Sequence, residues 1–363
     1  MAVAWIGSRE ALVGDAAAKA ADLLQSSRCP VFSLDTDIHG TRAAIALAEQ
    51  VGAVCDHAGD GGALARETAL FTDRGAMTIA PGETRRRADV VAIVGELPEI
   101  HHEFVGELAT TVPDLGGGNP RRFFLVGPAG TPAPPLGKGR KATPLSCGGQ
   151  DLCGTLAALR AQCAGRRTAL PVSNFPAFAE ALEGAHFPVF LFSGHAADGL
   201  ALAMLQGLIA DLNRKKRASG LHLPASESGW GSALVSTWMT GFPLRTGFAR
   251  GFPDFDPWRC DGARMIAAGE ADLHLRIAAL APEPPGKRSR MASIVLAKTA
   301  GPAAGAAVTI AIGAPGVDHD AVVYSSRLGS LRALGARTPS DLPAAAAILR
   351  LIAEQVGSEA LPC

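Results

Sequence analysis

The sequence predicts an α/β protein with several Rossmann-like βαβ lobes and parallel sheets. Along the chain, short apolar runs of strand length alternate with segments of helical periodicity. The hydrophobic share is 48% and the aromatic share only 5%, which suits layers packed with Ala, Val, Ile and Leu. A chain of 363 residues exceeds what one hydrophobic core usually supports, so we expect more than one lobe.

The first elements set this pattern. Residues 8–27 have helical spacing of Ala and Leu, and residues 30–34 form an apolar run typical of a buried strand. A second helix is expected to begin at Thr41 and to be closed by Gly52, and residues 53–55 resume a strand. Together these segments predict a βαβ unit.

The rest of the chain continues the alternation. Further helices are expected at residues 61–71, 100–108, 152–161, 175–183, 196–213 and 343–356, and further strands at residues 89–95, 121–126, 187–192, 220–223, 271–277, 293–297 and 307–312. Residues 224–262 hold three of the four tryptophans and show little periodicity. We expect them to be irregular and to cover a pocket or an interface.

The clearest break in composition is the Pro/Gly-rich stretch of residues 127–144. It leads us to expect an N-terminal α/β lobe over residues 1–140. A second α/β lobe, with the Trp-bearing segment, would follow over residues 141–285, and residues 286–363 would pack back on the two lobes.

Composition excludes several classes of protein. Lys plus Arg and Asp plus Glu number 34 each, so no net field would recruit nucleic acid or an anionic membrane. Seven scattered cysteines without a Cys-x-x-Cys pair argue against a disulfide framework and against a Cys-ligated zinc or iron–sulfur site. A charged residue occurs within the first nine residues, where a signal peptide would continue into an apolar segment. The sequence also has no run of eighteen apolar residues that could span a membrane, so we expect a cytoplasmic location.

A polar loop follows the first predicted strand of the βαβ unit. Asp35, Asp37 and His39 lie at its carboxyl end, where open α/β sheets bind ligands. They could contribute to a metal site with further ligands. Turn chemistry favours the simpler interpretation that the loop caps the next helix.

The loop after the second strand is rich in glycine: Asp56-His57-Ala58-Gly59-Asp60-Gly61-Gly62. It does not fit the dinucleotide pattern Gly-x-Gly-x-x-Gly. Its glycines would allow close backbone approach of a ligand or of another chain. The sequence also has neither a Gly-x-Ser-x-Gly elbow nor a phosphate loop, which excludes the common serine and nucleotide hydrolases.

Two other motifs resemble metal sites without completing them. The run beginning at His102-Glu103 starts like the zinc helix His-Glu-x-x-His, but Gly106 stands where the second histidine is needed. We interpret it as a solvent-facing helix start, with Glu103 and Glu107 solvated. The run Asp318-His319-Asp320 could hold a small metal site, although a polar loop explains it equally well.

Three basic clusters occur, at residues 138–141, 214–217 and 287–290. Clusters of this kind are usually solvated faces. Binding of a polyanionic ligand is the alternative.

Six stretches together resemble the B-type subunit of formylmethanofuran dehydrogenase, in the molybdopterin oxidoreductase superfamily: residues 26–64, 85–104, 193–213, 236–251, 269–277 and 307–334. Each motif is loose, but their order and spacing are specific and cover most of the chain. The resemblance implies a molybdopterin-oxidoreductase-like fold.

The chain also departs from the catalytic members of that family. Those members begin with a module that holds an iron–sulfur cluster, whereas this chain has no cysteine before Cys29, so we expect the fold to lack that module. They also supply a cysteine or selenocysteine to tungsten or molybdenum. By spacing, that ligand would fall at or beside Gly61 and Gly62, and Cys55 lies several residues too early to replace it.

A shortened B-type subunit of this kind resembles that of the formyltransferase/hydrolase complex of methylotrophic bacteria. In that complex, sister subunits move a formyl group from formyl-tetrahydromethanopterin to methylofuran and hydrolyse it to formate. The resemblance implies three partner subunits, of which one is amidohydrolase-like and one is a formyltransferase. It also suggests contact with polyglutamate-bearing methylofuran.

The first hypothesis is therefore a structural subunit with no catalytic residue, cofactor or metal. Its vestigial pocket would comprise Asp35, Asp37, His39, Asp56, His57, Gly61 and Gly62. One alternative is an active tungsten or molybdenum pterin subunit, and another is a module that binds the acidic tail of the carbon carrier. For a scaffold, we expect Trp230, Trp238 and Trp258 to be buried or interfacial anchors.

Overall fold

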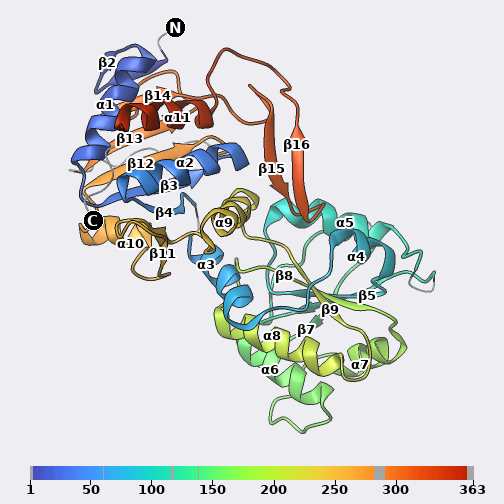
Figure 1. Ribbon diagram of the computed structural model, residues 1–363. Helices are drawn as coiled ribbons and strands as arrows, with labels where there is room; N and C mark the ends of the chain where they lie inside the picture. The colour runs from blue at the N-terminus through green and yellow to red at the C-terminus, as the bar shows by residue number, and fades with distance from the viewer. Residues whose placement is uncertain (1–2, 60, 116–117, 138, 282–290, 358–363) are drawn as a thin grey trace. The chain divides into compact units, whose positions relative to one another are not determined.

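The computed structural model describes residues 3–59, 61–115, 118–137, 139–281 and 291–357 (Figure 1). Contacts divide the chain into two units. Unit 1 comprises Met1–Gly61, Ser226–Tyr324 and Leu331–Cys363, and unit 2 comprises Gly62–Ala225 and Ser325–Ser330.

Unit 1 is built on a nine-stranded sheet whose order is β11-β10-β4-β3-β12-β13-β14-β1-β2. The five inner strands, β4, β3, β12, β13 and β14, run parallel, and antiparallel strands extend the sheet at both edges. The bounds are β1 (Ala4–Ile6), β2 (Arg9–Glu10), β3 (Pro30–Asp35), β4 (Val54–His57), β10 (Thr246–Gly247), β11 (Asp254–Phe255), β12 (Leu273–Ala278), β13 (Ala292–Ala297) and β14 (Val308–Ala311).

Five helices accompany this sheet: α1 (Val13–Ser26), α2 (Ile38–Val51), α9 (Glu227–Thr240), α10 (Gly262–Ala268) and α11 (Ala345–Val356). Helix α11 packs against both α1 and α2, and the three lie side by side in Figure 1. Helix α10 packs against β3 and β4. A separate two-stranded ribbon consists of β15 (Ala321–Ser325) and β16 (Ser330–Leu334).

Unit 2 contains a five-stranded, fully parallel sheet in the order β7-β6-β5-β8-β9. Its strands are β5 (Val90–Val94), β6 (Arg122–Val126), β7 (Thr143–Leu145), β8 (Pro188–Phe192) and β9 (Ser219–His222). Its helices are α3 (Gly61–Ala69), a π-helix η1 (Leu70–Arg74), α4 (Pro81–Arg87), a 3-10 helix η2 (Glu99–His101), α5 (His102–Thr110), α6 (Leu152–Cys163), α7 (Phe175–Gly184) and α8 (Gly199–Leu212).

Strand β5 is buried on both faces, and its side chains join two different cores. Val90, Ala92 and Val94 pack with residues of α6, α7 and α8. Val91 and Ile93 pack with residues of α5 on the opposite face. This alternation explains why the strand reads as a continuous apolar run, because side chains of period two enter a hydrophobic layer on either side. The expected α/β class with parallel sheets is confirmed.

The two units do not follow the expected lobes. Residue 140 lies inside unit 2, between β6 and β7, and these two strands pair with each other. Residues 286–363 belong mainly to unit 1, apart from Ser325–Ser330. The Pro/Gly-rich stretch is thus a long connection within one sheet, and composition alone does not distinguish this from a boundary.

The prediction that residues 224–262 are irregular is wrong. The segment contains α9, the start of α10 and the strands β10 and β11. Helix α9 begins at the N-cap Ser226, whose hydroxyl accepts from Gly229 N at 3.0 Å, and ends at the left-handed Gly241. The helix is rich in Gly, Ser and Thr, which have lower helix propensity than Ala or Leu, and most of its buried positions carry small side chains, so neither propensity nor apolar periodicity indicates a helix here.

Short strands were also missed. The expected helix over residues 8–27 begins only at Val13, because β1 and β2 form a hairpin before it with Gly7 at φ 59°. Strand β7 and the β15–β16 ribbon had no counterpart among the predictions. In the part of the chain that the structure describes, no helix is long and apolar enough to cross a membrane.

Candidate functional site

Six of the seven residues expected to form a vestigial pocket lie in unit 1, near the ends of the neighbouring strands β3 and β4, and Gly62 belongs to unit 2. The two strands are parallel neighbours, and Leu34 pairs in register with His57. The polar loops that follow both strands therefore meet at the carboxyl edge of the sheet, where α/β proteins bind ligands.

After β3, the polar residues are used by the fold. Asp35 accepts through Oδ2 from Ala281 N at 2.8 Å. Asp37 is the N-cap of α2 and accepts from Gly40 N at 2.9 Å. His39 lies exposed on the first turn of α2. The interpretation of this loop as a helix cap is confirmed for Asp37.

Within β4, one residue before its end, Asp56 is buried and satisfied by backbone donors. It accepts from His57 N at 2.8 Å and from Gly262 N, at the start of α10, at 2.9 Å. Burial raises the pKa of the Asp56 carboxyl, while Arg245 and the two N–H donors act in the opposite direction. The carboxylate thus fixes the β4 loop to α10.

Arg245 is a central side chain that sequence reasoning missed. Its guanidinium lies 3.6 Å from Asp56 through Nε and 2.8 Å from Asp261 through Nη2, and it donates from Nη1 to Pro257 O at 2.6 Å. Its backbone has φ 71°, a left-handed conformation that non-glycine residues adopt only at a cost of about 1 kcal/mol or more. No local pattern in the sequence marks such a residue.

His57 is buried, and a backbone carbonyl of the neighbouring strand β3 orients its ring. Its Nδ1 donates to Leu34 O at 2.8 Å. A Cβ added at Gly59 or at Gly229 would lie 3.0 Å from its Nε2, so both glycines permit the ring to fit between them. The close approach expected of the loop glycines is therefore made to a side chain of the same unit.

Gly61 stands at the position of the expected metal ligand. A Cβ placed there would lie 3.3 Å from Arg245 Nη2 and 3.3 Å from Asp56 Oδ1. Gly62 follows in the first turn of α3. Neither residue offers a donor atom on a side chain, and an ion pair lines the space. Asp60, between Gly59 and Gly61, lies outside the described residues.

Cys55 does not replace the missing ligand. It lies within β4, paired with Thr246 of β10, and is buried. Burial raises the pKa of its thiol, so the thiol stays protonated and is a poor ligand. The residues present do not fit a protein-ligated tungsten or molybdenum centre. Among the described residues, no cluster of three or more His, Cys, Asp or Glu side chains could hold a metal ion.

A second buried carboxylate, in unit 2, was also missed by sequence reasoning. Glu67 of α3 is 1% exposed and accepts from Gly194 N at 2.7 Å and from Ala225 N at 2.9 Å. Ser193 Oγ lies 3.3 Å and His222 Nε2 3.4 Å from the same oxygen. The serine hydroxyl thus faces a carboxylate, whereas a nucleophilic serine usually faces a histidine base. The cluster joins α3 to the chain after β8 and β9.

The incomplete zinc motif faces solvent in part, because Glu103 is 82% exposed in the first turn of α5. His101, just before it, is 1% exposed, and its Nε2 donates to Pro224 O at 2.8 Å. The prediction that Glu103 and Glu107 are only solvated is wrong. Arg327 pairs with Glu103 at 2.5 Å and with Glu107 at 2.9 Å. These partners are more than two hundred residues apart in sequence, so no local pattern shows them.

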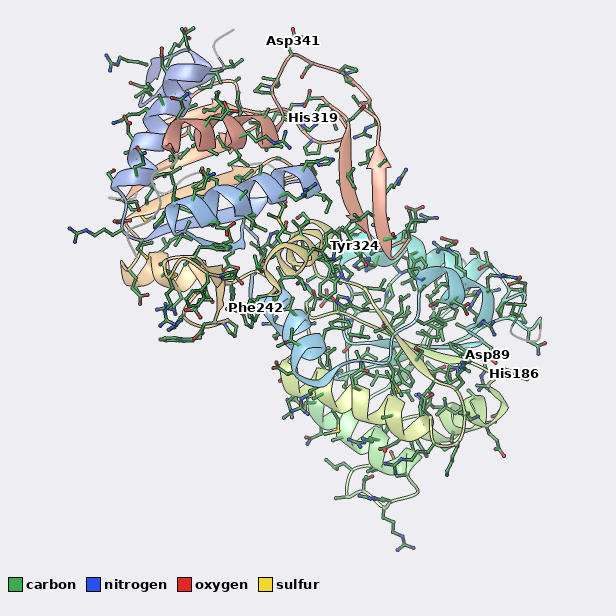
Figure 2. All side chains as sticks on the ribbon, in the orientation of Figure 1. Asp89, His186, Phe242, His319, Tyr324 and Asp341 are labelled. Atoms are coloured by element: carbon green, nitrogen blue, oxygen red, sulfur yellow. The ribbon has the colours of Figure 1, made fainter. Side chains whose placement is uncertain are left out.

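The run from Asp318 to Asp320 is a structural loop. Asp318 is buried and pairs with Lys298 at 2.7 Å, which lowers the pKa of its carboxyl. His319, labelled in Figure 2, donates from Nδ1 to the backbone carbonyl of Asp320 at 2.8 Å. The polar-loop interpretation is the one that these contacts favour.

Of the three basic clusters, residues 214–217 are fully described, whereas Lys138 and residues 287–290 lie outside the described residues. A cavity of about 700 Å³ opens between the carboxyl ends of α6 and α8. Its charged lining consists of Arg160, Arg166, Asp211, Arg214 and Lys215. The surplus of cationic groups makes this cavity attractive to anions.

Comparison with known proteins gives one consistent answer. No protein-family model matches the chain. The B-type subunit of the formyltransferase/hydrolase complex Fhc of Methylorubrum extorquens is 34% identical over 371 residues, which cover 99% of each chain. A chain in the crystal structure of the formyltransferase/hydrolase complex from Methylorubrum extorquens, in complex with methylofuran, matches with a TM-score of 0.88 and 31% identity. This match covers 97% of the present chain and 98% of that one.

Proposed function

The chain belongs to the family of the B-type subunit of the formyltransferase/hydrolase complex, and from this premise we propose that it is a structural subunit that performs no redox reaction. Its partners are the sister subunits of a hetero-oligomeric complex in one-carbon metabolism. Following the resemblance, the amidohydrolase-like partner would hydrolyse the formyl group and the formyltransferase partner would transfer it. We place the complex in the cytoplasm, which cell fractionation tests.

The proposal rests on the residues that surround Gly61. The position that would supply a thiolate has no side chain, and the Arg245–Asp56 ion pair lines the space around it. A cationic guanidinium at this place would stabilise a carboxylate of the protein itself. Asp35 and Asp37 support the proposal too, because their carboxylates accept from backbone N–H groups of unit 1.

Metal analysis of the purified complex tests the proposal. We expect no stoichiometric tungsten or molybdenum in the subunit, measured by mass spectrometry of the metals after native purification. One tungsten or molybdenum per subunit would favour the alternative, an active pterin subunit, and would overturn the structural role.

Restoring one thiol should not restore redox activity. In the variant Gly62→Cys, we expect no formate-dependent reduction of a viologen dye by the complex, because a single thiolate without further ligands and their supporting hydrogen bonds does not rebuild a metal centre. Gly62→Ser serves as the control of equal size. Dye reduction by the cysteine variant alone would contradict the prediction.

A second candidate function is supported by the cationic cavity. Arg214 is 81% exposed and lies 3.5 Å from Asp211, whose stronger partner is Arg160 at 2.6 Å. Arg214 can therefore reach an anionic ligand at little cost. We include binding of an acidic tail, such as the polyglutamate of the carbon carrier, in the proposal.

A peptide of linked glutamates tests this candidate. Its affinity for the full chain should fall steeply with salt, and neutralising residues 214–217 by Ser or Gln should abolish binding. Arg332→Ser, on the exposed strand β16, is the control. Binding that is insensitive to salt and to these substitutions would exclude the cavity as the site.

A further inference from the structure

All large aromatic side chains that are exposed in the described residues come from one short segment of unit 1. Together with one methionine they form what we call the aromatic patch, with exposed fractions of 57% for Trp238, 43% for Met239, 40% for Phe242, 54% for Phe252 and 68% for Trp258. The other exposed large hydrophobic residues are aliphatic or methionine and are spread along the chain. The antiparallel pairing of β10 with β11 and the stacking of Phe242 on Phe255 bring the two ends of this segment together, and exposed apolar side chains that gather on one surface mark interaction sites.

The patch is built on ordered structure. Trp238 and Met239 belong to the last turn of α9, which the left-handed Gly241 ends. Phe242, labelled in Figure 2, follows this cap. Its ring stacks on Phe255 of β11 with centroids 5.9 Å apart and planes 5° apart. Rings that are held in this way lose little conformational entropy on binding.

Trp258, the most exposed member, is also held in place. The Arg264 guanidinium lies 4.4 Å from its ring centroid, and Arg264 is in turn held by Glu270 at 2.5 Å. The backbone N–H of Trp258 donates to Asp256 Oδ1 at 2.9 Å. A tryptophan with one face on a fixed cation presents its other face as a rigid apolar surface.

Two arginines beside the patch are more exposed than the carboxylates that pair with them, whereas the pair of Arg264 and Glu270 has the opposite order, with exposures of 23% and 48%. Arg250 is 60% and Arg259 is 50% exposed, whereas Asp254, which pairs with both, is 27% exposed. The guanidinium groups are thus more accessible than the carboxylate that pairs with them. A partner with carboxylates at the border of its own apolar face would match this arrangement.

We propose that the aromatic patch is the docking surface for a sister subunit, whose matching face is apolar and bordered by carboxylates. This inference rests on the proposed function, because it needs a hetero-oligomeric complex. Exposed tryptophans are the side chains that most often dominate the energy of an interface. A second copy of this chain is a poorer occupant, because a two-fold contact of the patch with itself would bring its arginine borders together.

The test uses the full chain and separately purified sister subunits of the same organism. The double variant Trp258→Ala and Phe252→Ala should bind the sister subunits at least tenfold more weakly than wild type, measured by light scattering and by surface binding kinetics. Arg250→Glu should associate severalfold more slowly than wild type at low salt. At high salt, the two association rates should become equal. Leu12→Ala, 74% exposed in the same unit, is the control.

The outcomes separate the two proposals. If wild-type chain binds none of the sister subunits, the proposed function itself fails. If wild type assembles and the double variant assembles equally well, with an unchanged melting temperature, the aromatic patch is not the docking surface and the structural role stands. A dimer of the isolated chain that the double variant abolishes would show that the patch binds a second copy, and would overturn its assignment to a sister subunit.

Discussion

Each unit has a buried carboxylate that holds loops together at the carboxyl ends of its strands. In unit 1, Asp56 accepts from the backbone of its own loop and from the first turn of α10. In unit 2, Glu67 accepts from Gly194 N and Ala225 N. Both carboxylates lie near the carboxyl ends of strands, where open α/β sheets bind ligands, and both accept from backbone N–H groups of their own unit, although Glu67 Oε2 is buried without a hydrogen-bond partner among the described residues.

Removing the Glu67 carboxylate should destabilise unit 2. In Glu67→Ala, two buried N–H groups lose their acceptor, and we expect a loss of about 3 kcal/mol in the free energy of unfolding by urea. Glu67→Gln keeps a carbonyl acceptor and should lose about 1 kcal/mol. Equal losses in the two variants would show that the acceptor atom is not what matters.

His274 should make unit 1 sensitive to acid. Burial, with a smaller contribution from Arg276, lowers the pKa of His274 to about 4 from 6.5. Between these values the unfolded chain binds a proton that the folded chain does not, so stability falls as pH decreases from about 6.5 to about 4, by up to about 3 kcal/mol. Urea unfolding at several pH values checks this.

The control for this prediction is His274→Gln, which cannot titrate but can still meet the Ser33 hydroxyl, now 2.8 Å from the ring. The variant should lose less stability over the same pH interval. Identical pH profiles would assign the acid sensitivity to other groups.

At the level of elements, α9 shows why a helix can escape detection. Its contact with α2 is made by small residues, and Ser232 shares a hydrogen bond of 3.0 Å with Thr41. A Cβ at Gly231 would lie 3.1 Å from Tyr324 Cβ and 3.5 Å from Ile38 Cδ1. Close packing by glycine and serine replaces the apolar stripe that a sequence pattern would show.

Alanine at Gly231 should therefore be unfavourable although it raises helix propensity. We expect Gly231→Ala to cost about 1 kcal/mol in the free energy of unfolding, because crowding against Tyr324 outweighs the gain in propensity. The matched control is Gly14→Ala in α1, where nothing lies within 4 Å, and it should stabilise by about 0.5 kcal/mol. Stabilisation by both would contradict the packing argument.

At the level of the whole molecule, unit 1 is assembled from distant parts of the chain. Its sheet places β12, from the second half of the sequence, beside β3, from the first 61 residues. Unit 2 is nearly continuous in sequence, with Ser325–Ser330 as its only separate part. Folding of unit 1 thus requires contacts that close a long loop.

This difference predicts how fragments behave. A fragment of residues 62–225 should fold and unfold cooperatively in urea, because it contains all five strands of its sheet. A fragment of residues 226–363 should remain unfolded, because it lacks β3 and β4, and co-expression with residues 1–61 should rescue it. Circular dichroism and urea titration test both. Cooperative unfolding of residues 226–363 alone would contradict the prediction.

The sequence by itself determined the features that depend on near neighbours. The α/β class, most buried strands and the Asp37 cap follow from periodicity and turn chemistry within a few residues. The lack of a ligand at Gly61 followed from the resemblance and the spacing. Only the tertiary structure decided the division into units, the place of Arg245 beside Gly61 and the Glu67 cluster. These depend on residues far apart in the chain, and no local pattern encodes which of them meet.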